Sequence, residues 1–148
     1  VLRGLSALSG REIASERLAT ALRSRSQEDE HSCFSDTTHN DLVSNMEGIE
    51  SILFGTFTSN SGKVIIDETG FYDLIATADS EIAESVRNQF HTAKKLISVI
   101  PTPFDQSIMA QEGGSEHQAI QAAVAALWEF VYTLSDAEEA MQLSVKGR

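Results

Sequence analysis

The side chains of this sequence that could do chemistry are concentrated in one stretch, residues 27–41. These residues hold two of the chain's histidines, its single cysteine and five acidic side chains. Imidazole, thiolate and carboxylate groups are the common ligands of transition metals in proteins. A solvated acidic loop ahead of a helix has the same composition. The stretch therefore predicts either a metal-binding site or an ordinary polar connection.

The candidate metal ligands are His39, Asp36, His31 and Glu30. His39 lies three residues before Leu42 on the apolar stripe of a predicted helix, so its ring is expected to face inward at the helix start. A histidine in that position is either a ligand or a core histidine with its own hydrogen-bond partner. Transition-metal sites usually take three or four protein ligands. One histidine with one or two carboxylates therefore predicts an incomplete site for a divalent metal, iron or zinc.

The remaining site-lining candidates are Arg17, Ser32, Cys33 and Ser35. Arg17 lies close to the inward stripe of the first predicted helix, and an unpaired buried charge is costly. We expect it to pair with a carboxylate from residues 28–41. Cys33 is predicted to be buried and structural, because the surrounding negative charge disfavours a thiolate. No catalytic residue is predicted, since the sequence has no HExxH or HxxE motif.

Four amphipathic stretches must position these residues. Apolar side chains recur at helical spacing over 9–25, 36–57, 79–101 and 115–143, with Ser35 or Asp36 as the expected N-cap of the second stretch. One or two helical turns are predicted over 71–77, and a short extended segment over 64–66. The pattern predicts an all-α fold, an antiparallel four-helix bundle without a substantial sheet. The length of 148 residues fits a single domain over 1–148.

Composition excludes several classes of function. The net charge of −11 would be repelled by a phosphate backbone, so no nucleic-acid partner is expected. One cysteine cannot form an internal disulfide. The longest apolar stretch, 119–132, is too short to cross a bilayer, so no transmembrane segment is expected. The chain shows no signal peptide and does not begin with Met, which suggests a piece of a longer protein.

The stretch also carries a family resemblance. The run EHSCFSD at 30–36, followed by Thr38, His39 and Asp41, resembles the signature of the imelysin family, also called the insulin-cleaving membrane protease or iron-regulated protein A family. Residues 5–17 and 100–105 resemble the same family. The resemblance implies two all-helical bundles with a site between them. This chain resembles the C-terminal bundle and would supply half of that site.

The resemblance further implies an exported bacterial protein, in the periplasm or at the cell surface, associated with the cell envelope and with iron uptake. Its partner would be an N-terminal half with the motif GxHxxE, which this sequence lacks. A metal-binding component without turnover is favoured, because the chain has no complete hydrolytic constellation. The alternatives are a metallopeptidase completed by the N-terminal half, and a bundle that only docks that half. Asn40 departs from the arginine expected in the family and removes a cation.

Overall fold

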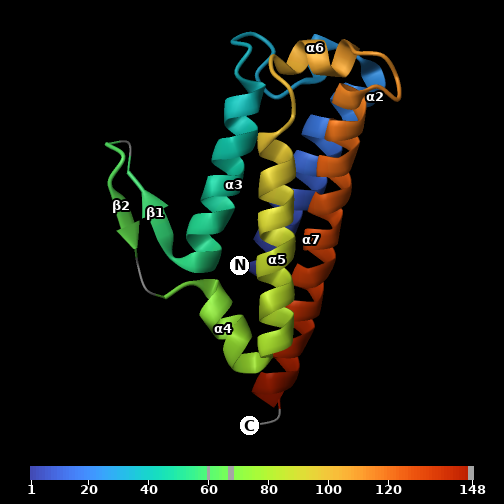
Figure 1. Ribbon diagram of the computed structural model, residues 1–148. Helices are drawn as coiled ribbons and strands as arrows, with labels where there is room; N and C mark the ends of the chain where they lie inside the picture. Colours follow the sequence, from blue (N-terminus) through green and yellow to red (C-terminus); the bar gives the residue numbers. More distant parts are fainter. Residues whose placement is uncertain (60, 67–68, 147–148) are drawn as a thin grey trace.

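The computed structural model describes residues 1–59, 61–66 and 69–146, and its long helices run side by side along one axis (Figure 1). In chain order, the elements are α1 (Leu2–Ser6), η1 (Ala7–Ala19), α2 (Thr20–Ser24), η2 (Gln27–Asp29), α3 (Thr38–Phe54), β1 (Thr56–Thr58), β2 (Val64–Ile66), α4 (Phe71–Ala78), α5 (Ser80–Ser98), α6 (Phe104–Met109) and α7 (Ser115–Lys146). The described chain is all-helical apart from one antiparallel hairpin. No helix in it is long and apolar enough to cross a membrane.

The first predicted helix begins earlier than expected, at Leu2, and its central part is a π-helix, η1. A π-helix bonds each residue to the one five positions away, so its turn is wider than that of an α-helix. Ile13 and Leu18, five residues apart, are accordingly both fully buried. The segment ends at Arg25, whose φ of 53° is left-handed and stops the helix.

The wide turn brings η1 against α7 at Gly10. A Cβ atom at that position would lie 3.1 Å from a ring carbon of Trp128 and 3.1 Å from a methyl group of Val131. The missing side chain therefore sets how closely these two elements approach.

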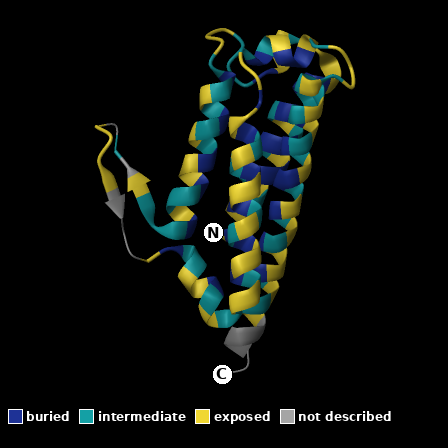
Figure 2. Ribbon diagram, in the orientation of Figure 1, coloured by how far each residue is buried: buried dark blue, intermediate teal, exposed yellow. Residues whose placement is uncertain are grey.

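The core lies between the long helices, where Figure 2 shows buried residues on their facing sides. Helix α5 packs along α7, and α7 along η1, whereas α3 makes fewer contacts with α5. Phe90 of α5 is fully buried and meets Phe130 of α7 edge to face, with ring centroids 5.7 Å apart. Phe54, at the end of α3, meets Phe90 at 5.5 Å. Aromatic contacts thus join three helices at mid-height.

Helix α3 confirms the predicted apolar stripe as far as Leu53. The helix is shorter than the predicted 36–57, so Phe57, the last predicted member of the stripe, lies exposed on the strand that follows. Leu42, Met46, Ile49 and Leu53 are all buried. The N-cap is Thr37, not Ser35 or Asp36, because Asp36 turns the chain in a left-handed conformation with φ 52°. Gly55, with φ 65°, ends the helix.

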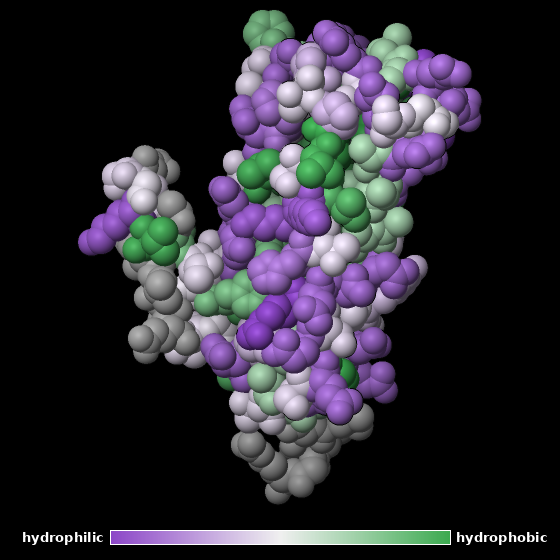
Figure 3. Space-filling view, viewed as in Figure 1, coloured by the Kyte–Doolittle hydropathy of each residue, from purple (hydrophilic) through white to green (hydrophobic). Residues whose placement is uncertain are grey.

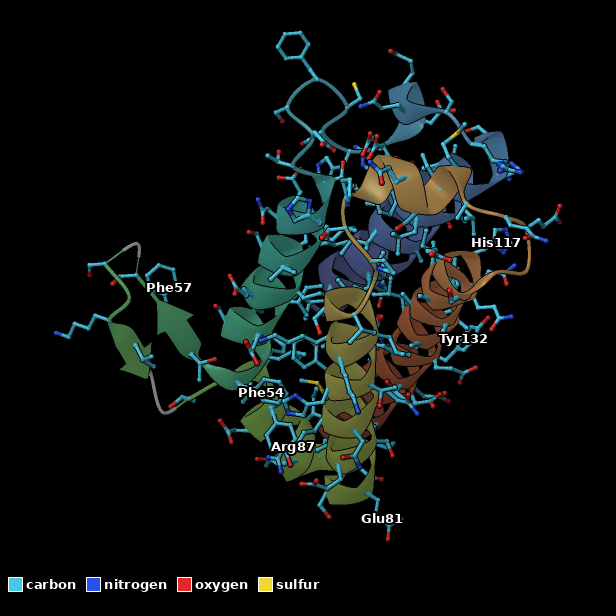
Figure 4. The ribbon with its side chains drawn as sticks, turned by 45° about the horizontal axis from the view of Figure 1, so that its top comes forward. Phe54, Phe57, Glu81, Arg87, His117 and Tyr132 are labelled. Atoms are coloured by element: carbon cyan, nitrogen blue, oxygen red, sulfur yellow. The ribbon has the colours of Figure 1, made fainter. Side chains whose placement is uncertain are left out.

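The chain after α3 forms the hairpin β1–β2, in which Phe57 pairs with Ile65. The extended segment predicted over 64–66 is thereby confirmed as a strand. The hairpin projects to one side of the helices, and Phe57 on it is largely exposed (Figures 1 and 4). The chain returns past the end of α3 at Gly70, where a Cβ atom would lie 2.1 Å from the Leu53 carbonyl oxygen.

Helix α6 was not predicted. The third long helix ends at Ser98 rather than near Pro101, and α6 then crosses the end of the bundle (Figure 1). The hydroxyl group of Ser107 donates to the Pro101 carbonyl oxygen at 2.6 Å. The Arg25 guanidinium donates to the carbonyl oxygens of Met109 and Ala110, at 2.5 Å and 3.0 Å. These bonds tie α6 to the end of α2.

Two glycine substitutions test this packing. Gly70→Ala should lower the free energy of unfolding by about 1–3 kcal/mol, because the new methyl group collides with a backbone carbonyl. Gly48→Ala, inside α3, meets nothing within 4 Å and should raise it by about 0.5–1 kcal/mol. Urea unfolding of both variants checks the pair. Equal effects at the two positions would contradict the close passage of Gly70.

Candidate functional site

The predicted site segment folds over one end of the helices, beside α6 (Figure 1). Its most buried acidic residue is Glu30, which caps the C-terminal end of η2 and is only 4 % exposed. Neither Glu30 carboxylate oxygen has a hydrogen-bond partner among the described residues. Burying a carboxyl group without a partner is costly, and proteins rarely do so. Glu30 is therefore the leading site residue.

Burial raises the pKa of Glu30 above the ordinary glutamate value. The nearby Thr38 hydroxyl lowers this pKa in part, although it does not reach hydrogen-bond geometry with either oxygen. The carboxylates of Asp105 and Asp36 raise the pKa further, since like charges oppose ionisation. No ion pair in the described chain includes any of these three acids.

Asp105 is a site residue that the sequence analysis missed. It lies in the first turn of α6, and its Oδ1 atom is buried without a partner among the described residues. The stretch 100–105 drew notice only for its family resemblance. An acid after two prolines does not by itself indicate a neighbour far away in sequence.

Hydrogen bonds from Ser32 hold the segment against the start of α3. The backbone N–H of Ser32 donates to Thr38 Oγ1 at 3.0 Å, and its hydroxyl group donates to an Asp41 carboxylate oxygen. The Gln27 side-chain amide donates to the Cys33 carbonyl oxygen at 3.4 Å. Cys33 is a free thiol and is half-buried rather than buried as predicted. Ser32 thus positions the segment that carries Glu30.

His39 faces a different compartment. It lines a pocket of about 370 Å³ between α3 and the C-terminal part of α5, and its Nδ1 atom is buried with no hydrogen-bond partner in the part of the chain that the structure describes. The other described lining residues are Asn40, Val43, Ser44, Glu47, Ile97, Ser98, Ile100 and Thr102. Hydrophobic side chains reach the surface in this part of the molecule (Figure 3). Glu30 does not line the pocket.

The structure therefore divides the predicted ligands. His31 is half-buried with an unpartnered Nδ1, whereas Asp36 is exposed. Ser35 is also exposed, and its hydroxyl group bonds that of Thr37 at 2.8 Å. Within the described residues, no three His, Cys, Asp or Glu side chains come together so as to hold a metal ion.

The predicted pairing of Arg17 is wrong. Arg17 is half-buried in η1, and it forms no ion pair or side-chain hydrogen bond within the described chain. The prediction placed Arg17 by α-helical spacing, which does not hold on the wider turn of a π-helix. The side chain remains partly in water, so it does not need a buried partner.

Comparison with known families decides the chain's membership. The family model described as Imelysin matches residues 1–134, which is most of the chain. The chain belongs to the imelysin family. The matched range includes all three stretches in which this imelysin chain resembled the family, at 5–17, 30–41 and 100–105. A search of curated proteins finds no match.

The raised pKa of Glu30 predicts a specific pH dependence. A pKa that folding raises stabilises the folded state below the unfolded pKa, and this stabilisation is lost as the pH rises through the folded pKa. At about pH 8, Glu30→Gln should therefore have a higher free energy of unfolding than the wild type. The difference should shrink as the pH falls through the raised pKa of the folded state, and it should vanish below the ordinary glutamate pKa of about 4.3.

Chemical unfolding across this pH range measures the difference. Glu28→Gln is the matched control, because Glu28 is an exposed acid in the same segment. Glu28→Gln should change the free energy of unfolding by no more than about 0.5 kcal/mol at every pH. A Glu30→Gln variant that behaves like this control would show that the Glu30 carboxyl group is not buried without a partner.

Proposed function

We propose that this chain is the C-terminal bundle of an exported imelysin-type protein associated with iron or metal uptake. On this proposal the four long helical segments form a four-helix bundle, and its α6 end supplies half of a site that an N-terminal half completes. The family membership supports the architecture. The resemblance of the sequence to imelysins supports the export and the role in metal uptake.

The observation that carries the proposal is the gathering of unpartnered polar atoms at the α6 end. Within the described chain, Glu30, His31, His39 and Asp105 all bury side-chain atoms that have no hydrogen-bond partner there. Leaving such groups unsatisfied costs free energy, so each calls for an explanation. A ligand or second domain that supplies their missing partners would explain all four together.

The residues of this chain fit a metal site only in part. Carboxylate and imidazole groups are suitable donors, but the described residues bring no three of them together. The proposed site is therefore a half-site, with Glu30 and His39 as its buried donors on this chain. Its other ligands would come from the N-terminal half.

A role in binding is better supported than peptide hydrolysis. A metallopeptidase needs a general base placed beside a set of metal ligands. The described residues do not form such an arrangement, so the proposal assigns this chain a binding role without turnover.

Calorimetric titration of the 148-residue chain with Zn²⁺ and Fe²⁺ tests the proposal. The chain alone should bind weakly, because its ligand set is incomplete, and His39→Ala should weaken binding at least about tenfold. His91→Ala is the control, since His91 is exposed on α5 and stacks on Phe54 at 5.7 Å. Equal affinity in the wild type and His39→Ala would show that His39 is a core histidine.

A further inference from the structure

We propose that Glu30 and Asp105 together form a binding site for a hard divalent cation, between the segment 26–37 and α6. All ligands that the chain supplies to this site, which we call the seat, are oxygen atoms. This inference deepens the proposed function, on which it rests, because it names one ligand class and adds a residue. It also separates Glu30 from His39, with which the sequence had grouped it.

The burial of Glu30 is the first observation. Its side chain is 96 % removed from solvent, being 4 % exposed, and both carboxylate oxygens lack a partner in the described chain. Asp105, on the other element, independently buries an oxygen without a partner. The two acids come from segments far apart in the sequence that the fold places at the same end of the bundle (Figure 1).

The surroundings of the two acids are the second observation. Arg25 is the cation that links α2 to α6, but its guanidinium donates to the carbonyl oxygens of Met109 and Ala110. Asp36 adds a third negative charge near Glu30. The ion pairs of the described chain are Arg3–Glu138, Arg11–Glu12, Arg87–Glu84 and Lys94–Glu50, so none of them neutralises this group.

The chemistry of the donors selects the ligand. Two carboxyl groups offer only oxygen atoms, which hard cations such as Ca²⁺, Mg²⁺ and Mn²⁺ prefer, completing their shells with water. Zn²⁺ prefers nitrogen and sulfur ligands, and His39 faces another pocket. A third acid at the margin of the seat, Asp36, suits a divalent rather than a monovalent charge.

The hydrogen bonds that hold the two sides of the seat in place do not involve the cation. Ser32 fastens the segment to the start of α3, and Arg25 fastens α6 to α2. Neither bond uses Glu30 or Asp105. The two acids are therefore held near each other before a cation arrives, and binding replaces their repulsion with attraction to a shared charge.

Thermal unfolding of the full chain with CaCl₂ or MnCl₂ tests the seat, with KCl at matched ionic strength as the reference for a protein of net charge −11. Each divalent cation should raise the wild-type Tm saturably. Asp105→Asn and Glu30→Gln should weaken this dependence at least about tenfold. Both variants should fold stably without the metal, because each substitution removes one of the repelling negative charges. Glu112→Gln, an exposed acid after α6, should retain the full dependence.

The outcomes separate this inference from the proposed function. A calcium effect lost in Asp105→Asn but kept in His39→Ala supports the seat, whatever the result of the Zn²⁺ and Fe²⁺ titration. No shift in the wild type, an undiminished shift in Asp105→Asn, or a larger shift with ZnCl₂ that needs Asp105 would each overturn it. Zinc binding that does not depend on His39 would contradict the proposed function and leave the seat unaffected.

Discussion

Keeping the unpaired carboxyl group of Glu30 out of water costs free energy, and the contacts that hold the segment 26–37 must offset that cost. Ser32 makes two of these contacts with the first turn of α3. Arg25, at the end of α2, fixes α6 on the other side. The buried core between η1, α5 and α7 supports both. The α6 end is thus a strained arrangement on a well-packed base, which is where a binding site is expected.

The structure places the predicted ligands in two separate places, which argues against the single metal site predicted from the sequence. The sequence grouped His39 with Glu30 because both lie in one short stretch. In the structure His39 lines the pocket between α3 and α5, while Glu30 lies near enough to Asp105 of α6 for that charge to raise its pKa. A soft or borderline metal would draw on the first compartment, and a hard cation on the second. Both proposals involve Glu30, but the test of the first follows His39 and the test of the second follows Asp105, so their results can be told apart.

Much of the fold was predictable, because apolar spacing in α3, α5 and α7 follows the ordinary helical period. The stretch 30–41 was also recognisable from its composition. Three features were not predictable: the π-helical turn of η1, which displaced Arg17; the left-handed Asp36, which moved the helix cap to Thr37; and α6, which brought Asp105 to Glu30. Each depends on contacts between distant segments, which periodicity does not encode.

The central claim is that Glu30 is a buried acid with no hydrogen-bond partner among the described residues. Following its side-chain carboxyl carbon by NMR through a pH titration measures this directly. The account predicts a midpoint above the ordinary glutamate value. It also predicts a lower midpoint once CaCl₂ is added, because a bound cation favours the ionised carboxylate. A Glu30 midpoint at or below the ordinary glutamate value without calcium would contradict it, because the carboxylate would then be solvated or paired.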